Sequence, residues 1–437
     1  MPLHSKILIG LIAGAIVGGF ASVREVAWLQ SALSMLAPFG TAWVRLIMMT
    51  VLPLVVASLL VGVASLGDLR SLGRVGGKTL TFFIANTAIA ATIGLVLALT
   101  IKPGSFVDES VQEQLAAQFQ SEAAGHVVVS EGAESLADQL VAMIPRNPVD
   151  AATRLDLLQL IVFTVLFGAA VSVLPQARRD PVVKFFHGIN DASVVVIHWV
   201  MVLAPAAVFA LIAPVVGRLG LEILEGLLVY GLLVLGGLLL VVFGLYAVVL
   251  RLLAGVAPLT FYRRVARAPL VAFSTSSSNA TLPVTMETAE EELGISKRIV
   301  SFVLPLGATM NMNGSALHFA VSTVFIAQVY GAPLGPSEHL TIVLTSTVAA
   351  VAGPGVPASG LISILIVLSA TGLGALSEVG IALIVGMDRI LDMLRTTVNV
   401  TGDLVVVAAV ARTEGEGPTE SYLGGAPEVD ALTKTVP

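Results

Sequence analysis

The sequence predicts an all-α, polytopic membrane protein with eight transmembrane helices and two re-entrant helical hairpins, and three observations support this fold class. Of the 437 residues, 56% are hydrophobic and 12% are charged, and the mean hydropathy is +0.95. An ordinary soluble domain is less apolar and carries about twice that share of charged residues. Apolar segments of about 20 residues, the length that a helix needs to cross a bilayer, recur along the chain. Two further apolar segments are each interrupted in the middle by polar or Gly/Pro-rich residues.

The eight expected spans follow one another with one long connection. The first apolar run, Ile7 to Phe20, resembles a signal peptide, but no small-residue cleavage site stands out before Arg24. We therefore expect it to be retained as a helix. The spans are expected near residues 5–22, 40–66, 79–101, 157–175, 190–216, 222–252, 299–330 and 376–411.

The two interrupted segments, 257–290 and 337–372, are expected to form the hairpins. Their interruptions are Ser274 to Asn279 and Ala352 to Gly360. Irregular backbone at membrane depth is tolerated only where it is buried in protein or lines a water-filled cavity. Two such breaks in comparable positions indicate a binding site and a weak inverted repeat. The alternative is that one or both segments are plain spans with a kink.

The distribution of charge predicts the topology. Lys and Arg cluster at 70–78, 178–184 and 251–267, and such clusters mark cytoplasmic connections. The loop at 102–150 is acidic and is expected outside. Both termini are then cytoplasmic, provided that each hairpin returns to the side from which it entered. The tail from Thr413 to Pro437 is rich in Gly, Pro and Glu and is expected to be disordered.

Composition also excludes several function classes. The net charge is -6 and no basic, aromatic-interleaved surface is visible, so a nucleic-acid partner is not expected. The chain contains no cysteine, which excludes disulfides, thiolate catalysis and Cys-ligated metal sites.

The last apolar span carries a polar stripe. At about 100° per residue, five polar side chains fall within an arc of roughly 80° on a helix. An ionised side chain at membrane depth costs on the order of 3 kcal/mol, so these residues need partners or access to water, and they mark a substrate or ion path. The alternative is a set of internal salt bridges, for which Asp392 and Arg395 have the i, i+3 spacing. The stripe consists of Asp388, Asp392, Arg395, Asn399 and Asp403.

Two further polar features lie upstream of the stripe. Ser274 to Ser278 offers hydroxyls and free backbone amides at a hairpin tip, where helix N-termini favour a carboxylate. Gly307 to Ser315 is polar and Gly-punctuated within the seventh span, and we expect it to unwind the helix. Freed carbonyls together with the Asp403 carboxylate are the hard oxygen donors that a sodium ion prefers. A packing kink is the alternative.

The order of four motifs resembles that of the dicarboxylate/amino acid:cation symporters, the glutamate transporters. These motifs are the serine-rich tip, Asn-Met-Asn-Gly-Ser, the Gly-Val-Pro tip and Asp-x-x-Arg-Thr-x-x-Asn-x-x-x-Asp. The resemblance covers Leu3 to Arg412 and is specific from Phe273 to Asp403. It implies the glutamate-transporter fold and a cation-coupled symporter of aspartate or glutamate in a prokaryotic inner (plasma) membrane. Sodium is the expected coupled cation, with a proton as the alternative.

The resemblance also implies roles for individual residues. Arg395 would bind the side-chain carboxylate of the substrate and Asp392 its ammonium group, which fits the bidentate geometry of a guanidinium. The other residues of the implied substrate site are Ser277, Ser278, Thr281, Ser315, Val356, Pro357, Ala358, Thr396 and Asn399. The implied cation ligands are Asp403 with carbonyls of Gly307, Asn311 and Asn399 at one site, and carbonyls of Thr309, Ala350 and Gly353 at a second.

The sequence departs from the family pattern at several positions. Asn313 is neutral where relatives have a carboxylate that helps to hold a third sodium ion. Phe83, Asn86 and Thr87 replace a tyrosine, a threonine and a serine near that site. Relatives also carry an extra arginine, at the position of Ser276 or of Met393. Two interpretations of Arg389 remain open, because it either substitutes for that arginine or pairs with Asp388.

The resemblance further implies a homotrimer that works by an elevator type of alternating access. A proton-coupled glutamate or C4-dicarboxylate symporter of the same fold is the nearest alternative. An intramembrane enzyme is another, since Ser277 and His318 are present, but no hydrolase or zinc-protease motif occurs. An anion channel is the third. The expected units are scaffold helices in 1–76 and 151–219, transport-domain segments in 77–101 and 220–412, the loop 102–150 and the tail 413–437.

Overall fold

The computed structural model describes residues 3–65, 74–108, 112–113, 141, 144–154, 157–220, 222–353 and 359–417. Within these ranges the regular secondary structure is helical, which confirms the predicted all-α class. Six helical segments there are long and apolar enough to cross a membrane. They are Ser5–Val23, Ala27–Val61, Arg74–Phe106, Gln176–Val202, Ile223–Ala254 and Gly380–Thr413, and the shorter apolar helices are Gln159–Ser172, Ala204–Arg218 and Gly360–Ala370.

The N-terminal half differs from the prediction at two spans. Its helices are α1 (Leu3–Val23), α2 (Ala27–Ser34), α3 (Ala37–Met48), α4 (Val51–Ser65), α6 (Arg74–Ile101), the short η2 (Pro103–Phe106), α9 (Pro148–Thr153), α10 (Leu157–Ser172), α11 (Gln176–Val202) and α12 (Ala204–Leu219). The span expected at 40–66 corresponds to most of the candidate span Ala27–Val61, but a turn between α3 and α4 interrupts its helix. Pro53 lies in the first turn of α4, and the Thr50 hydroxyl donates to the Ile47 carbonyl (2.7 Å) at the break. The helix α2 was not predicted.

The single span expected at 190–216 is wrong, because two separate helices cover it. Its first part is α11, which begins at Gln176, because hydropathy locates apolar residues and not the point where a helix starts. Pro205 lies in the first turn of α12 and separates the two helices at Leu203.

The C-terminal half contains the predicted interruptions. Its elements are α13 (Glu222–Leu240), η3 (Val241–Tyr246), α14 (Ala247–Val249), η4 (Leu250–Ala254), α15 (Pro258–Val265), α16 (Arg267–Thr275), α17 (Ser278–Glu291), α18 (Lys297–Met310), α19 (Asn313–Val329), α20 (Pro336–Ala352), α21 (Ser359–Ala370), η5 (Gly374–Leu376) and α22 (Ser377–Thr413). The unwinding expected in the seventh span is confirmed, because α18 ends at Met310 and α19 begins at Asn313.

The first interrupted segment breaks between α16 and α17. Ser276 has a left-handed backbone (φ 52°), which costs a non-glycine residue roughly 1 to 2 kcal/mol. Ser277 then caps α17, since its hydroxyl accepts from the Ala280 N–H (3.2 Å). The second segment breaks between α20 and α21. Residues 354–358 of this break, which include Val356, Pro357 and Ala358, lie outside the described part of the chain.

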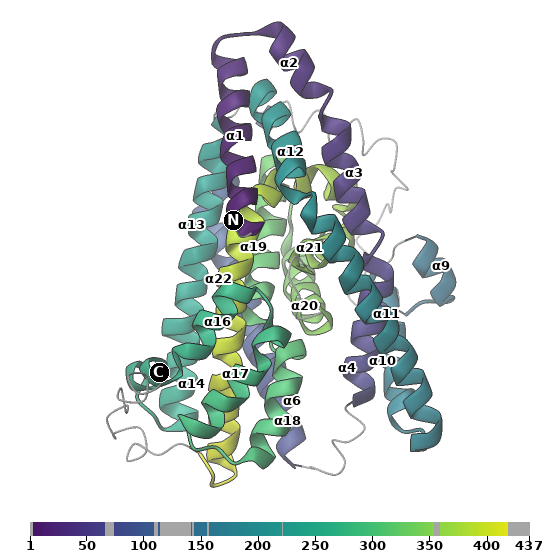
Figure 1. Cartoon of the computed structure of the whole chain (residues 1–437), viewed down its shortest axis with the longest axis vertical. Coiled ribbons are helices and arrows are strands. Elements are labelled where there is room, and N and C mark those ends of the chain that lie inside the picture. The colour runs from purple at the N-terminus through teal and green to yellow at the C-terminus, as the bar shows by residue number, and fades with distance from the viewer. Residues whose placement is uncertain are drawn as a thin grey trace, which may run out of the picture.

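The packing places α22 at the centre. It contacts α16, α17, α18, α19, α13 and α21 along its length (Figure 1). At the upper end of this view α1 packs along α12, and at one side α4, α10 and α11 contact one another. Gly10 and Gly18 of α1 face the α12 backbone so closely that a Cβ atom would collide with it, and at Gly14 a Cβ atom would lie 3.3 Å from it. Small residues at this spacing allow two membrane helices to approach.

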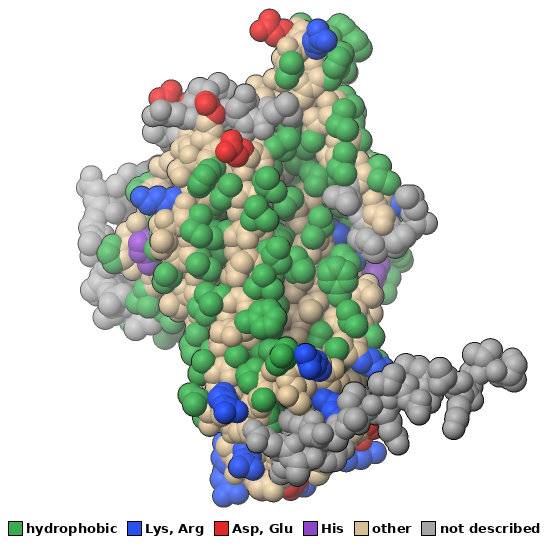
Figure 2. All heavy atoms as spheres, turned by 90° about the vertical axis from the view of Figure 1, so that its left-hand side faces the viewer, with side chains coloured by type: hydrophobic (Ala, Val, Ile, Leu, Met, Phe, Trp, Pro, Cys, Tyr) green, Lys and Arg blue, Asp and Glu red, His purple; other side chains and the backbone are tan. Residues whose placement is uncertain are grey.

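The surface carries an apolar band between polar ends. Figure 2 shows hydrophobic side chains over the middle of one face, with Lys and Arg gathered mainly at the lower end and Asp and Glu mainly at the upper end. Large apolar side chains such as Leu232 of α13, Phe243 of η3 and Leu252 of η4 are exposed on the described part of the chain. An apolar girdle of this kind matches the hydrocarbon core of a bilayer.

Residues just after α22 are tied to other helices. The Glu414 carboxylate pairs with Arg74 (2.9 Å) and Lys78 (2.7 Å) of α6. Glu416 pairs with Arg298 (2.7 Å) of α18. The disorder expected from Thr413 onward is therefore wrong for residues 413–417, because charge pairs that are distant in sequence hold them. Residues 418–437 lie outside the described part of the chain.

Glu414→Gln should lower the thermal stability in a pH-dependent way. Hydrogen bonds from Arg74 and Lys78 lower the pKa of Glu414 from 4.5 to about 2. The stabilisation is therefore present above pH 4.5 and is lost as the pH falls from 4.5 toward 2. We expect a constant difference in Tm between the wild type and Glu414→Gln from pH 8 to 5, and a shrinking difference below that.

The same difference should narrow at 1 M salt, where the Debye length is only about 3 Å. Glu290→Gln is the control, because it removes a carboxylate that has no ion pair among the described residues. A Tm difference that is independent of both pH and salt would contradict an ionic contribution of Glu414 to stability.

Candidate substrate and ion site

The polar stripe of α22 is buried. Asp388, Asp392, Arg395, Asn399 and Asp403 are between 1% and 6% exposed. The helical periodicity therefore predicted the correct face. Each of these side chains has a polar partner, so the cost of burying it is offset within the protein.

Arg395 is held by two carboxylates of its own helix. Its Nη2 atom lies 2.9 Å from Asp392 Oδ1 and 3.2 Å from Asp388 Oδ1. The internal salt bridge that the sequence left open for Asp392 and Arg395 is thus present. Arg389 pairs with Asp392 (3.2 Å), so its suggested pairing with Asp388 is wrong. Three consecutive turns of α22 carry one connected charge cluster.

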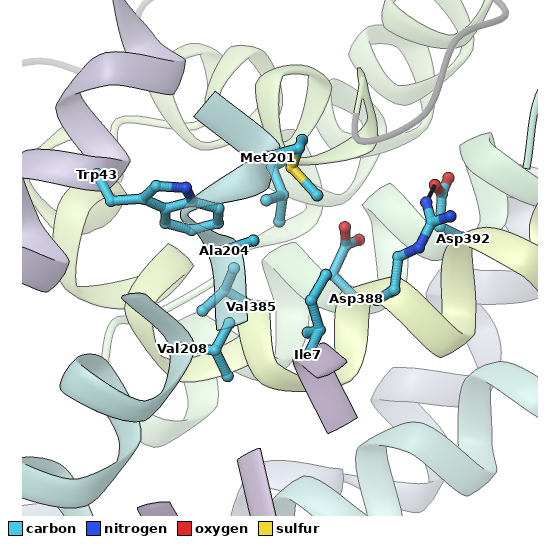
Figure 3. Close-up of a pocket in the computed structure, with 10 residues that line it drawn as sticks. Ile7, Trp43, Met201, Ala204, Val208, Val385, Asp388 and Asp392 are labelled. Carbon is cyan, nitrogen blue, oxygen red and sulfur yellow. Dashed lines mark hydrogen bonds and ion pairs between the residues drawn. The ribbon is translucent and has the colours of Figure 1, made fainter. Parts of the chain in front are cut away.

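Asp388, Arg389 and Asp392 also line a cavity. Its opposite wall comes from α1, α3, α11 and α12, so it lies where the N-terminal helices meet α22. Asp388 points into the space beside Met201 and Ala204, while Trp43 closes the far side (Figure 3). The Trp43 Nε1–H donates to the Val200 carbonyl (2.9 Å), which fixes the indole in place.

His318 is a site residue that the sequence analysis did not assign. It is fully buried in α19, and its Nδ1 atom contacts Arg395 Nη1. Its Nε2 atom lies 2.6 Å from the Tyr230 hydroxyl of α13, which in turn lies 2.9 Å from Ser322 Oγ. A histidine within an apolar membrane span is itself a signal for a functional site. The sequence analysis considered His318 only for an enzyme.

The helix α21 approaches Arg395 from another side. At Gly360 a Cβ atom would lie 2.7 Å from Arg395 Cζ, so the glycine leaves room for the guanidinium. Interiors are close-packed, and any larger residue here must displace one of the two groups.

The tip between α16 and α17 lies against α22. Ser277, Ser278 and Thr281 are buried there. The Thr281 hydroxyl donates to the Ser277 carbonyl (2.8 Å), which tightens the start of α17. Buried hydroxyls at a helix N-terminus form a polar lining suited to a carboxylate.

The start of α19 is joined to α22 through Asn399. The Gly314 N–H donates to Asn399 Oδ1 (2.9 Å), and Asn399 Nδ2 donates to Ser315 Oγ (3.2 Å). The Thr396 hydroxyl donates to the Asp392 carbonyl (2.8 Å). Three polar side chains therefore lie close together near Arg395: Thr396 and Asn399 of α22 and Ser315 of α19.

Asp403, Asn311 and Gly307 come together at the break between α18 and α19. Asn311 Nδ2 donates to Asp403 Oδ1 (2.9 Å), while the buried Asn311 Oδ1 has no partner. A Cβ atom at Gly307 would lie 2.6 Å from Asp403 Oδ1, so only glycine admits the carboxylate there. A carboxylate beside an unpaired amide oxygen and unwound backbone fits a hard monovalent cation. Among the described residues no group of three His, Cys, Asp or Glu side chains could hold a metal ion.

The residues of the second expected cation site lie on neighbouring helices. Thr309 is near the end of α18, and Ala350 and Gly353 are at the end of α20, which packs against α18.

Asn313 is satisfied by protein partners at both ends of its amide. Asn313 Nδ2 donates to the Tyr246 hydroxyl (2.8 Å), and Thr87 Oγ1 donates to Asn313 Oδ1 (2.7 Å). Tyr246 donates to the Val398 carbonyl (3.1 Å). Phe83 is buried nearby without any oxygen in its side chain.

Comparisons with known proteins agree with this geometry. Residues 3–413 match the sodium:dicarboxylate symporter family. The chain is 35% identical to the proton/sodium-glutamate symport protein of Bacillus caldotenax over 413 residues, which is 94% of each chain. It is 34% identical to the proton/glutamate-aspartate symporter of Escherichia coli (strain K12), over 94% of this chain and 92% of the relative. It is 32% identical to a C4-dicarboxylate transport protein of Anaeromyxobacter sp. (strain K), over 95% and 90%.

The match extends over almost all of the chain, including α22, both interrupted segments and the broken α18–α19. The protein is thus a multi-pass membrane transporter and not an enzyme. It belongs to the sodium:dicarboxylate symporter family.

Proposed function

We propose that this protein is a cation-coupled symporter that imports aspartate or glutamate. The observation that carries the proposal is the buried cluster of Arg395 with Asp392 and Asp388 on α22. An acidic amino acid brings both a distal carboxylate and an ammonium group. Its carboxylate can take the guanidinium of Arg395, while Asp392, now free of Arg395, can take the ammonium group. The internal pair of Arg395 with Asp392 is exchanged for two intermolecular ion pairs, while Asp388 gives up its contact with Arg395.

The polar lining around this cluster supports the same substrate class. Ser277, Ser278 and Thr281 are placed for the main-chain carboxylate, and Val356 to Ala358 are proposed to join them. Ser315, Thr396 and Asn399 are placed for the remaining polar groups of the substrate.

Sodium is the proposed main coupled ion. Asp403 with Gly307, Asn311 and Asn399 would form one site, and Thr309, Ala350 and Gly353 a second. The names of the relatives include both proton and sodium, so a proton as one coupled cation is compatible with the comparisons.

The proposed architecture is an elevator. Eight spans and the two re-entrant hairpins, α16–α17 and α20–α21, would lie in the plasma membrane with both termini in the cytoplasm. The helices α1 to α4 and α10 to α12 would form the trimeric scaffold. The rest, centred on α22, would move as a transport domain. The cavity between α22 and the N-terminal helices lies at the boundary between these two proposed units.

Uptake into proteoliposomes tests this function. The purified protein is reconstituted, a sodium or proton gradient is imposed, and uptake of labelled aspartate, glutamate, succinate and serine is measured. We expect gradient-driven uptake of aspartate or glutamate, several times faster than that of succinate, because succinate has no ammonium group for Asp392. Preference for succinate would favour the second candidate, a C4-dicarboxylate symporter, which one of the relatives is named for.

A further inference from the structure

His318 makes contacts that fix its protonation state. Arginine has only donor groups, so the contact between Arg395 and His318 Nδ1 requires that Nδ1 accepts. His318 is then the neutral tautomer with its hydrogen on Nε2, which donates to the Tyr230 hydroxyl (2.6 Å). Tyr230 in turn donates to Ser322 Oγ (2.9 Å). The four side chains form one directed chain of hydrogen bonds that begins at the guanidinium of Arg395.

This chain depends on the position of Arg395. While the guanidinium donates to Nδ1, a second proton there would face both a donor and a positive charge. When the guanidinium turns away, Nδ1 becomes a buried acceptor without a partner, and Asp388, on the other side of Arg395, loses the same cation. A proton on Nδ1 then removes the unpaired acceptor and replaces part of the positive charge that this cluster has lost.

We propose that His318 is the binding site of a coupled proton. Nδ1 takes up a proton from water when Arg395 moves to the distal carboxylate of the substrate, and it releases that proton when the substrate leaves and Arg395 returns. This inference rests on the proposed function, in which Arg395 binds a carboxylate. It adds a residue that the polar stripe does not contain.

The surroundings of His318 contain few other titratable groups. From α22 it faces Arg395, behind which lie Asp388 and Asp392, and from α13 it faces Tyr230. The other helices packed on α19 are α6, α20, α21 and η2. Their charged residues and histidines are confined to the ends: Arg74 and Lys78 at the start of α6, Lys102 next to η2, and Glu338 and His339 at the start of α20. Arg395 is therefore the charge that controls this histidine.

Calorimetry on the purified protein measures the proton directly. Aspartate binding in sodium at fixed pH is compared in buffers with different ionisation enthalpies, which gives the number of protons taken up per aspartate. We expect uptake approaching one for the wild type and near zero for His318→Gln. Glutamine keeps an acceptor for Arg395 and a donor for Tyr230, but it cannot hold a proton. His198→Gln, at an exposed position of α11, is the control and should match the wild type.

The outcomes separate this inference from the proposed function. Wild-type protein that binds aspartate with no proton uptake, or His318→Gln that takes up as many protons as the wild type, overturns the inference and leaves the symporter intact. Wild-type protein that binds no acidic amino acid overturns the proposed function itself.

A measurement without substitution covers the case in which His318→Gln does not fold. In ¹⁵N-histidine-labelled wild type, nuclear magnetic resonance distinguishes neutral from doubly protonated rings. One histidine should change from the neutral Nε2–H form to the imidazolium form when aspartate is added. No change in any histidine signal would overturn the inference.

Discussion

Arg395→Ala should abolish the binding of aspartate and glutamate. The variant leaves Asp388 and Asp392 without their shared cation and removes the partner of the substrate's distal carboxylate. Removing one partner of a buried ion pair costs about 3 to 5 kcal/mol, so the affinity should fall at least a hundredfold, at about 1.4 kcal/mol per factor of ten. Calorimetric titration of the purified protein with both amino acids measures this loss, and small neutral amino acids should gain affinity relative to acidic ones.

Two variants on the same helix provide controls. Arg389→Ala removes an arginine that pairs with Asp392 but leaves Arg395 in place, so aspartate affinity should stay within about tenfold of the wild type. Arg395→Lys keeps the charge but loses the planar fork and should lie between the two. If Arg395→Ala binds aspartate within about tenfold, or ~1.4 kcal/mol, of the wild type, the role assigned to Arg395 is wrong.

The second large effect concerns the number of coupled cations. Asp392 and Asp403 contribute two negative charges, Arg395 one positive charge, and an acidic amino acid one further negative charge. Counted over these groups, the loaded site needs about two monovalent cations to avoid an uncompensated buried charge, and any charge on Asp388 enters equally with asparagine or aspartate at position 313. An aspartate at position 313 would add one more charge and require one more cation. We expect the wild type to transport at least one cation fewer per substrate than sodium-coupled relatives that bear this aspartate.

The contacts of Asn313 support this expectation. Its amide is occupied by Tyr246 and Thr87, so the space is filled by neutral hydrogen bonds. Asn313→Asp should raise the coupling number by one, best in combination with Phe83→Tyr, which adds an oxygen, and with Asn86→Thr and Thr87→Ser, which restore the family's hydroxyl residues. Reversal potentials in proteoliposomes at stepped sodium and proton gradients give the number. An unchanged number in the combined variant, or a wild type that couples sodium alone in the number found for aspartate-bearing relatives, would refute the charge count.

The sequence was sufficient for the features that repeat with a helical period. The buried face of α22 follows from the spacing of Asp388, Asp392, Arg395, Asn399 and Asp403. The break before Asn313 follows from the Asn and Gly residues that surround it. Such signals are local, so one sequence contains them.

Contacts between distant segments could not be predicted in this way. His318 is 77 residues from Arg395, and a single histidine in an apolar helix does not identify its partner. The ion pairs of Glu414 with Arg74 and Lys78 join residues more than 300 positions apart. The pairing of Asp388 with Arg395, two turns apart on one helix, agrees with the helical spacing, but the sequence alone does not show that Arg395 pairs with both Asp388 and Asp392.

The absence of a side chain at Gly360 makes the position of α21 sensitive to the position of Arg395. The first turn of α21 packs against the Arg395 guanidinium, and a Cβ atom at Gly360 would lie 2.7 Å from the guanidinium carbon. In the proposed function that planar group turns to the substrate, and it then vacates a space of its own size next to α21. Close-packed interiors do not keep such voids, so α21 must settle into the space or the arginine must return. Substrates differ in whether they carry a distal negative charge. In the proposed function this difference decides whether Arg395 leaves its place, and it thereby changes the position of α21 relative to the site.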